Sequence, residues 1–281
     1  PKLVQAWFPE KEIGAVRSAD FSSDGRSVVT TSATINLAEL AQAQAAQPQG
    51  VVDARVWDLH TGEPLTRPFK HSAFIYDVAF SPDGRRLATA SGEDGIVQVF
   101  DVFTGEPVTP LKHGKQVRRV RFSPDGKRLA TAASDGARLW NAETGELISL
   151  LLRGDSHDAA FSSDGRAVVS AAIDQVAIRV TPVNPNPYSS RPGTVRVWDA
   201  VSGEPISPAI PHAEVYRTAF SPDGRFILTA GFDRTARVWN AATGEPVTPV
   251  LKHGQAVYDA SFSADGRSVV TAGADRLAWL W

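Results

Sequence analysis

Histidine, threonine and aspartate recur together along this chain, and they are the residue types of a hydrolytic triad. The four sets are His71, Thr89 and Asp94; His113, Thr131 and Asp135; His212, Thr229 and Asp233; and His253, Thr271 and Asp275. A catalytic set occurs once in a protein, whereas buried polar groups need hydrogen-bond partners wherever a structural unit is repeated. Four near-copies therefore indicate a structural role.

Asp155 and His157 form a second candidate for chemistry, because an aspartate that orients a histidine is a general-base arrangement. Two residues apart on a strand, their side chains could face the same way. The spacing offers them no nucleophile or third ligand, and the sequence has no phosphate loop, zinc-type His-Glu pair or nucleophile elbow. We expect no enzymatic activity, no metal and no cofactor. A hydrolase, the least favoured alternative, requires this pair to converge on groups from a loop insert.

The structural units that position these residues are marked by a repeated sequence motif. The motif ends in Phe, Ser, a small residue or Pro, Asp and Gly, and its phenylalanines are Phe21, Phe80, Phe122, Phe161, Phe220 and Phe262. The intervals are 59, 42, 39, 59 and 42 residues. A period in this range is typical of stacked supersecondary units. The two long intervals lie three repeats apart and indicate an internal duplication with one insert in each half.

Each repeat contains runs of strand length in a fixed order. An apolar run leads to Phe and the Asp-Gly pair, and a second run, an Asp, a run ending in Trp and Thr-Gly-Glu-Pro follow. Asp-Gly between apolar runs predicts a hairpin in which both central residues have positive φ. Each repeat is therefore expected to be a four-stranded antiparallel meander.

These motifs resemble the WD-repeat β-propeller family over nearly the whole chain. The similarity is carried by Phe80-Ser81-Pro82-Asp83-Gly84, by Val56-Trp57-Asp58, and by Thr229 through Asp233 to Trp239. It implies that a His, a Ser or Thr, an Asp and a Trp lock each blade. The fifth and sixth repeats match fully, the third matches with one residue deleted, and the second has Phe100 in place of Trp. The first and fourth lack the His, which predicts weaker local order there.

We expect one all-β domain over residues 1–281, a six-bladed propeller with inserts at about 34–53 and 175–193. The chain stops where a third strand ends, and Lys2 to Phe8 suits the missing fourth strand, so this segment is expected to close the last blade. A fragment of a seven-bladed ring is the alternative. Prolines after Glu-Pro should protect the outer edges, and we expect a monomer.

Composition narrows the classes of partner. The net charge is −2 with interspersed signs, so no basic surface predicts nucleic-acid binding. No apolar run approaches the length of a membrane span. The absence of cysteine leaves the compartment open, with the cytoplasm favoured. Arginine and alanine usage hints at a bacterial source, and the chain is compatible with a sensing module cut from a larger protein.

The resemblance implies that partners bind on the face carrying the loops into the first strand and out of the second. On this face lie the positions four and six before each Phe and the residue before the turn Asp. Tyr, Phe and Arg are common there, and these residue types anchor protein interfaces. The tyrosines could instead only fill space between blades. The partner-binding candidates are Arg17, Phe74, Tyr76, Glu93, Gln116, Arg118, Asp155, His157, Glu214, Tyr216, Phe232 and Tyr258.

Both inserts should rise from this same face. The first contains Asn36 to Leu40, which suits a short helix opened by an asparagine cap. The second contains Asn184 to Tyr188 and suits an extended, proline-stiffened arm. We expect a non-catalytic scaffold or sensing module that binds a protein partner between the inserts. A small-molecule or carbohydrate receptor at the axial channel is the alternative.

Overall fold

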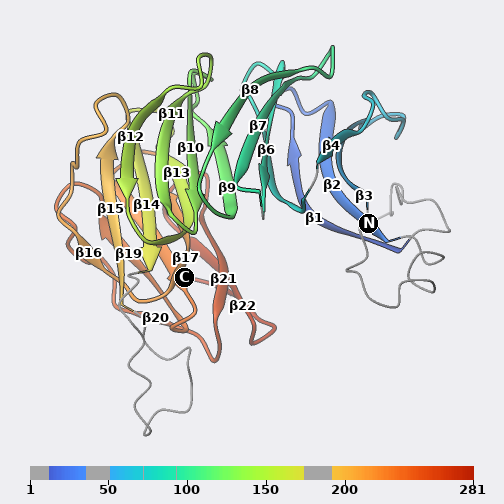
Figure 1. Cartoon of the computed structure of the whole chain (residues 1–281). Coiled ribbons are helices and arrows are strands. Elements are labelled where there is room, and N and C mark those ends of the chain that lie inside the picture. The colour runs from blue at the N-terminus through green and yellow to red at the C-terminus, as the bar shows by residue number, and fades with distance from the viewer. Residues whose placement is uncertain (1–12, 36–50, 72, 93, 174–191) are drawn as a thin grey trace, which may run out of the picture. The chain divides into compact units, whose positions relative to one another are not determined.

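The computed structural model describes residues 13–35, 51–71, 73–92, 94–173 and 192–281, and these residues form β-strands and turns without a helix (Figure 1). Within them, no helix exists that could cross a membrane. The chain divides into two compact units, Pro1–Val120 and Arg121–Trp281, and each unit is described by itself. The expected closing strand and the central parts of both inserts lie outside the described residues.

Unit one contains two complete antiparallel sheets whose strands follow chain order. Sheet one consists of β1 (Ile13–Phe21), β2 (Ser27–Ile35), β3 (Val51–Asp58) and β4 (Phe69–His71). Sheet two consists of β5 (Ile75–Phe80), β6 (Arg86–Ser91), β7 (Ile96–Asp101) and β8 (Pro107–Lys112). The unit boundary falls within β9 (Val117–Phe122), the first strand of sheet three.

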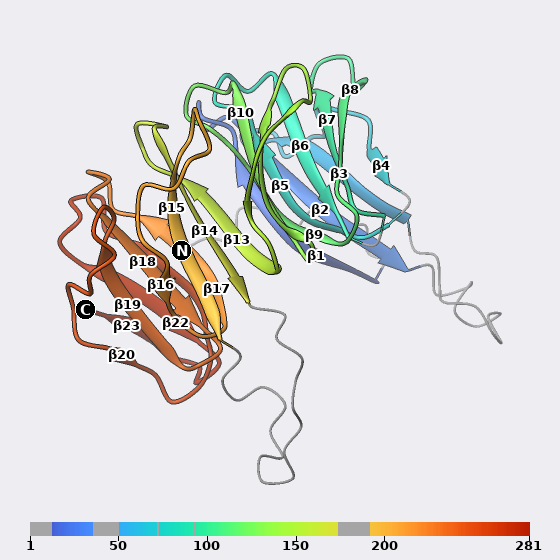
Figure 2. The same ribbon diagram turned by 60° about the vertical axis from the view of Figure 1, so that its left-hand side comes forward.

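Unit two contains the rest of sheet three and three further sheets, and most of their strands are labelled in Figure 2. Sheet three continues with β10 (Arg128–Ala133), β11 (Gly136–Asn141) and β12 (Leu147–Leu152). Sheet four has β13 (Asp155–Phe161), β14 (Ala167–Ile173), β15 (Gly193–Asp199) and β16 (Ile210–Pro211). Sheet five has β17 (Val215–Phe220), β18 (Phe226–Gly231), β19 (Thr235–Asn240) and β20 (Leu251–Lys252). Sheet six has β21 (Val257–Phe262), β22 (Val269–Gly273) and β23 (Ala278–Leu280).

Apolar cores lie between consecutive sheets within each unit. In unit one, Val56 of β3 and Leu87 of β6 belong to a core between sheets one and two. In unit two, three cores join sheet three to four, four to five and five to six. Fully burying a residue such as Ile227, which is 0% exposed, contributes about 1.5–3 kcal/mol. The period-two alternation that predicts strands therefore also builds the contacts that stack one sheet on the next.

The Asp-Gly hairpins form, but their expected turn type is wrong. Only the glycine of each pair has a positive φ, between 64° and 71°, and Asp24 and its equivalents do not. In each repeat the Ser hydroxyl donates to the Asp carboxylate over 2.5–2.6 Å. In sheet one the same carboxylate accepts the N–H of Arg26, and the N–H of Gly25 donates to the carbonyl of Ser22. These bonds hold the aspartate at negative φ, so only the glycine must adopt the left-handed conformation.

The strands reach further into the first insert than expected. Thr34 of β2 pairs with Val51 of β3, so the hairpin continues past the expected start of the insert at residue 34. The second insert is likewise shortened at its end, because Gly193 begins β15 and pairs with Ile173. The candidate helix at Asn36 to Leu40 and the candidate arm at Asn184 to Tyr188 lie outside the described residues.

Candidate interaction surface

The His-Thr-Asp sets of sheets five and six are internal hydrogen-bond networks. In sheet six, His253 Nε2 lies 2.7 Å from Thr271 Oγ1, and His253 Nδ1 lies 3.1 Å from Asp275 Oδ2. Trp281 Nε1 donates to the same threonine hydroxyl over 2.9 Å. Burial acts to raise the pKa of Asp275, but bonds from the N–H groups of Leu277 and Gly254 and from His253 outweigh it and lower that pKa. The polar groups satisfy one another, as the structural interpretation requires.

Sheet five repeats this network with the imidazole turned over. His212 Nδ1 lies 2.6 Å from Thr229 Oγ1, and its Nε2 lies 2.9 Å from Thr235 Oγ1 and 3.3 Å from Asp233. Trp239 Nε1 donates to Thr229 over 2.8 Å. In both sheets the threonine contacts the histidine and the tryptophan together, so it joins the second strand of the sheet to the third.

The incomplete sets keep part of the network. Trp57 donates to Thr30 over 2.9 Å in sheet one, and Trp198 donates to Ser170 over 2.9 Å in sheet four, although both repeats lack the histidine. In sheet two, His71 Nε2 lies 3.0 Å from Thr89 Oγ1, and its ring meets Phe100 edge-on. The indole or phenyl ring therefore remains packed on the second strand even where the full set is absent.

In four repeats the candidate position four residues before the Phe lies in a β-bulge. The pairing register shifts at Tyr76 in β5, His157 in β13, Tyr216 in β17 and Tyr258 in β21. A bulge inserts an extra residue into one strand and re-aims its side chain. Plain strand alternation could not have revealed this, yet the bulge falls at the selected position in four repeats.

Four of the candidates in unit two meet in one cluster, which we call the aromatic patch: His157, Tyr216, Phe232 and Tyr258. Ring centroids lie 5.5 Å apart for His157 and Tyr216, 5.2 Å for Tyr216 and Phe232, and 5.9 Å for Phe232 and Tyr258. Phe232 is 37% exposed and Tyr258 is 48% exposed. His157 and Tyr258, which are 101 positions apart in the sequence, thus belong to one cluster. Phe232 and Tyr258 are exposed on it, and the half-buried ring of Tyr216 packs against His157 and Phe232.

Asp155 and Glu214 border the aromatic patch. Asp155 Oδ2 lies 3.7 Å from His157 Nε2, so the two side chains do face the same way. His157 Nδ1 is buried and has no hydrogen-bond partner among the described residues. Glu214 is 3% exposed with φ of 52°, and its carbonyl accepts the N–H of Phe232 over 3.0 Å. This bond fixes the loop that presents Phe232.

The candidates of unit one are placed less completely. Phe74 is 43% exposed, and the ring of Tyr76 lies so close to Gly92 that it would overlap a Cβ atom at that position. Gln116 and Arg118 are half-buried, and both make polar or electrostatic contacts. Arg17 lies in β1, its side chain is outside the description, and Glu93 lies outside the described residues.

Sequence reasoning missed the polar position three residues before each Phe. Its occupants in chain order are Ser18, Asp77, Arg119, Asp158, Arg217 and Asp259. The carboxylate of Asp77 accepts the hydroxyl of Ser18 and the N–H of Val120, and Arg119 lies 3.6 Å away. In unit two, Asp158 accepts the N–H of Thr218, and Arg217 lies 3.8 Å from Asp158 and 2.9 Å from Asp259. The signal was visible as an alternation of acid and base from repeat to repeat.

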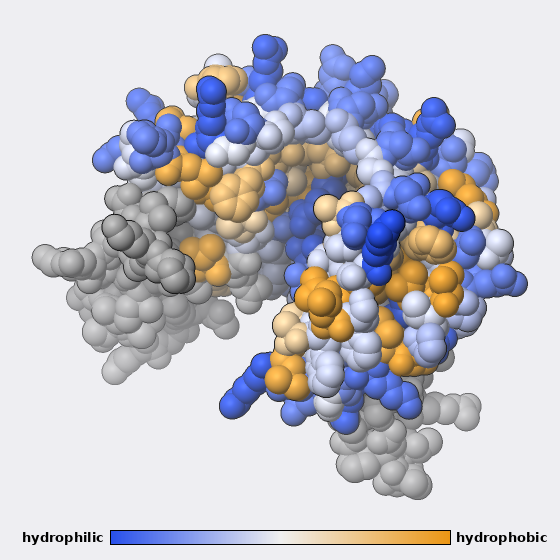
Figure 3. All heavy atoms as spheres, turned by 180° about the vertical axis from the view of Figure 1, so that it is seen from behind, coloured by the Kyte–Doolittle hydropathy of each residue, from blue (hydrophilic) through white to orange (hydrophobic). Residues whose placement is uncertain are grey.

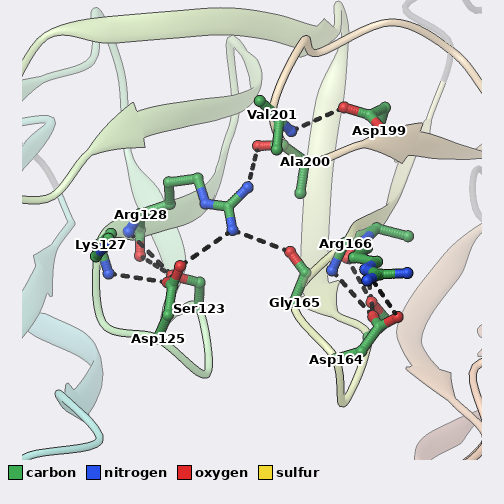
Figure 4. A network of polar contacts seen from close by, with 12 residues as sticks. Ser123, Asp125, Lys127, Arg128, Asp164, Gly165, Arg166, Asp199, Ala200 and Val201 are labelled. Atoms are coloured by element: carbon green, nitrogen blue, oxygen red, sulfur yellow. Dashed lines mark hydrogen bonds and ion pairs between the residues drawn. The ribbon is translucent and has the colours of Figure 1, made fainter.

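Arg128 joins sheets three and four inside unit two. Its guanidinium donates to the carbonyl oxygens of Ala200 and Gly165 over 2.8 and 3.1 Å and also reaches Asp125 (Figure 4). The neighbouring pair Asp164 and Arg166 is 4.0 Å apart and largely solvent-exposed. Backbone carbonyls are thus the main partners of Arg128, which ties two turns together.

Apolar side chains also reach the surface elsewhere (Figure 3). On sheet six, Trp279 is 43% exposed and Leu280 is 76% exposed, and Trp279 stacks on Trp281 with centroids 5.6 Å apart. Phe103 and Val201, in the turns before Gly-Glu-Pro, are 81% and 71% exposed. They occupy the same position of the repeat, which holds His60, Glu143 and Ala242 in three other repeats, so the position is not apolar throughout.

The described residues contain no cluster of three or more His, Asp or Glu side chains placed to hold a metal ion. Around Asp155 and His157 they contribute aromatic rings, and the inserts that a hydrolase would need lie outside the description. The absence of catalysis therefore stays a prediction.

The fold and the repeated networks define an all-β repeat protein of antiparallel sheets. The family model described as WD domain, G-beta repeat, matches residues 62–101, 105–141, 204–240 and 244–281. These segments cover more than half of the chain and coincide with the four His-Thr-Asp sets. The chain belongs to the WD-repeat family, which confirms the resemblance and the all-β fold class.

Two curated relatives add context. A chromatin assembly factor 1 subunit of Gallus gallus is 28% identical over 191 residues, which are 64% of this chain and 27% of that protein. Autophagy-related protein 18 of Komagataella pastoris is 43% identical over 53 residues, which are 19% of this chain and 10% of that protein. The matches thus span a minor part of each relative. Both organisms are eukaryotic, so the comparisons do not support the expected bacterial source.

Proposed function

We propose that this chain is a non-catalytic protein-interaction module that binds a partner through the surface carrying the aromatic patch. The observation that carries the proposal is the convergence of four rings from the bulges and loop of three consecutive sheets. Membership of the WD-repeat family supports a scaffold role, and one relative is by name a subunit of an assembly factor.

The physical basis is the residue composition of the patch. Tyrosine and phenylalanine bury a large area on binding and lose little conformational entropy, and tyrosine keeps a polar group for hydrogen bonding. The rings pack on one another before any partner arrives, so a partner would meet a largely preformed surface. We propose separate partner contacts in unit one at the remaining candidates, Arg17, Phe74, Tyr76, Glu93, Gln116 and Arg118.

Affinity capture with a matched control tests the proposal. The variant carries Tyr216→Ala and Tyr258→Ala, and the control carries Phe103→Ala and Val201→Ala, which also remove exposed apolar groups but are not residues of the patch. All forms must first show equal thermal unfolding. We expect a partner that is retained by wild type and control and lost by the patch variant, and that binds again when purified. Equal capture by the patch variant would refute the assignment, and capture of no protein would favour the small-ligand alternative.

We further propose that residues 1–281 form one domain and that this domain is a monomer. Apolar cores of the same kind join consecutive sheets within each unit, which supports cooperative folding. Calorimetric unfolding should then show a single transition, and two separate transitions would contradict the proposal.

A further inference from the structure

The outer edge of sheet three differs from the outer edges of sheets one, two, four and five. Its outer strand, β12 (Leu147–Leu152), comes last in the order of the sheet, so one side of its backbone pairs with no strand among the described residues (Figure 1). The outer strands of sheets one, four and five have three, two and two residues, and β8 of sheet two has six, as β12 does. β12 is therefore one of two long outer edges in the described chain.

The residue types that protect the other outer edges are missing from β12. After the Glu of the turn, four repeats carry proline, whereas the third repeat carries Leu147; the prolines are Pro64, Pro107, Pro205 and Pro246. In β8 a second proline and a lysine occupy the positions that Leu150 and Leu152 have in β12. Proline removes a backbone donor, and a charged side chain opposes the approach of another strand. The run from Leu147 to Leu152 contains neither.

Core packing does not explain the whole apolar run. The segments 146–154 and 106–114 align residue by residue, and the position that the core requires is Leu151 in β12 and Leu111 in β8. These two side chains are 3% and 1% exposed. Leu147 and Ile148, at the start of β12, are 50% and 36% exposed. The strand thus combines an edge without protection and apolar side chains at the surface.

Charges at the two ends of β12 give a complementary strand its direction. Glu146 precedes β12 and Arg153 follows it, and both residues are exposed. In an antiparallel pair the C-terminal end of the added strand lies beside Glu146, and its N-terminal end lies beside Arg153. Opposite charges that face each other across two strands stabilise the pair. A complementary strand therefore has an acidic N-terminal end and a basic C-terminal end.

The size of the edge indicates which kind of molecule fits it. Six residues of strand are about 20 Å long, and a strip about 10 Å wide on each partner gives on the order of 400 Å² in total. Stable interfaces between folded proteins bury roughly 1,200 Å² or more. Register shifts against β11 at Ile148 and Leu151 also bend β12, so another strand can follow only part of it. The edge is too small to hold two copies of this chain together, but it suits an extended segment of a partner.

We propose that the outer edge of β12 binds an extended segment of a protein partner by antiparallel strand addition, the segment being acidic at its N-terminal end and basic at its C-terminal end. Main-chain hydrogen bonds would provide the affinity. Contacts with Leu147 and Ile148 and the two end charges would provide the selectivity. None of these residues belongs to the aromatic patch, so this second surface goes beyond the proposed function and can fail without affecting it.

NMR of leucine methyl groups with two synthetic peptides tests the proposal, because it detects binding at millimolar peptide. The first probe is acetyl-Asp-Thr-Val-Thr-Val-Thr-Val-Lys-amide, and the second has the Asp and the Lys exchanged. We expect the first probe to shift the methyl signals of Leu147 and Leu150 and to leave those of Leu129, a fully buried residue of β10, unchanged. The second probe should bind about 2- to 30-fold more weakly, because two opposite-charge pairs across the strands are lost.

A proline variant tests the role of the backbone. Leu147→Pro with Leu150→Pro gives β12 the residues that β8 has at Pro107 and Pro110. These prolines pair with β7 in the register that the two leucines have with β11, so the variant should fold. We expect it to bind the first probe about 5- to 100-fold more weakly, because two backbone donors are removed.

A charge exchange tests the direction of the added strand and needs no proline. Glu146→Arg with Arg153→Glu should reverse the preference between the two probes. Glu106→Arg, at the exposed start of β8, is the control and should leave the preference unchanged.

Four results would overturn the proposal: no shift at millimolar peptide, equal binding of the two probes, unchanged binding by a folded proline variant, or an unreversed preference after the charge exchange. If the proline variant does not fold, the charge exchange decides. Sedimentation of the free protein adds one further outcome, since a wild-type dimer that dissociates in the charge-exchange or proline variant would assign the edge to a second copy and overturn the proposal.

Discussion

Two histidines of unit two, His253 and His157, lie in different surroundings. His253 has hydrogen-bond partners on both ring nitrogens, and its side chain is fully buried. His157 packs against the rings of Tyr216 and Phe232, and its Nδ1 has no hydrogen-bond partner among the described residues. The first arrangement stabilises a sheet, because each polar atom is satisfied. In the second, aromatic rings surround the imidazole, and the patch that they form is the proposed binding surface.

The difference shows that residue type alone does not separate structure from function in this repeat. Both histidines neighbour an aspartate and aromatic rings. Solvent exposure of the neighbouring rings does not separate them either, because Trp281 beside His253 is 39% exposed and Phe232 beside His157 is 37% exposed. The hydrogen bonding of the imidazole distinguishes them: both nitrogens of His253 have partners, whereas Nδ1 of His157 has none among the described residues. Variants should therefore separate stability from binding.

The largest effect is expected from Trp239→Ala. This change removes a buried ring and the hydrogen bond to Thr229, and should lower the free energy of unfolding by about 3–5 kcal/mol. Tyr258→Ala should cost about 1 kcal/mol or less, because its side chain is half exposed. Urea unfolding followed by circular dichroism measures both. Similar losses would contradict the division between network and patch.

Arg217→Gln should have an intermediate effect. It removes the cation beside Asp158, a carboxylate with 2% side-chain exposure that also accepts bonds from Thr218. We expect a loss of about 1–3 kcal/mol in unfolding free energy. The matched change Arg166→Gln breaks an exposed 4.0 Å pair with Asp164 and should cost about 0.5 kcal/mol or less. Equal losses of unfolding free energy for the two variants would show that Arg217, at the polar position three residues before Phe220, does not stabilise the unit.

Ser162→Ala tests the turn network through its pH dependence. The Ser162 hydroxyl is the largest cause that lowers the pKa of Asp164, followed by the N–H of Arg166. A carboxyl with a depressed folded pKa contributes stability above its unfolded pKa and loses that contribution as the pH falls through the folded pKa. The variant should therefore unfold in acid at a higher pH than wild type.

Ser163→Ala is the control for that experiment. The Ser163 hydroxyl donates to the Pro222 carbonyl and does not contact the carboxylate. Its substitution should change stability by a similar amount at every pH. An identical acid-unfolding profile for the two serine variants would show that the Asp164 carboxylate is not the source of the pH dependence.

The smallest effect is expected at His71. Burial lowers its pKa, and the charge of Asp94 opposes this shift. Since the folded pKa lies below the unfolded value of about 6.5, the contribution of His71 is complete above that value and declines as the pH falls towards the folded pKa. His71→Phe should flatten the stability profile in that window, whereas His60→Phe, at an exposed turn, should not. Unchanged stability profiles in both variants would show that titration of His71 does not cause the loss of stability in this pH window.

Much of this fold could be predicted from local sequence. The Phe-Ser-x-Asp-Gly motif predicted six hairpins, and the family resemblance implied that Thr271 and Trp281 belong to one network, in which they form a hydrogen bond. The turn type was wrong because hydrogen bonds from Ser22 and Arg26 to Asp24, which depend on the folded turn, hold that residue at negative φ.

The candidate surface was predictable only in part. The resemblance selected Tyr216 and Tyr258 one by one, but their contact depends on bulges that the period-two pattern does not encode. The buried role of Asp158 was missed for a related reason. Its partners, Thr218 and Arg217, are about 60 residues away and meet it only when two sheets stack.

The sequence by itself determined the number of repeats, the order of strands within each sheet and the residues that satisfy one another inside it. These features depend on contacts between neighbours in the chain, for which periodicity and spacing are direct signals. Only the tertiary structure decided which polar side chains join one sheet to the next and which rings meet at the surface. Those contacts link distant residues, and their geometry arises from bulges and side-chain packing that no local pattern specifies.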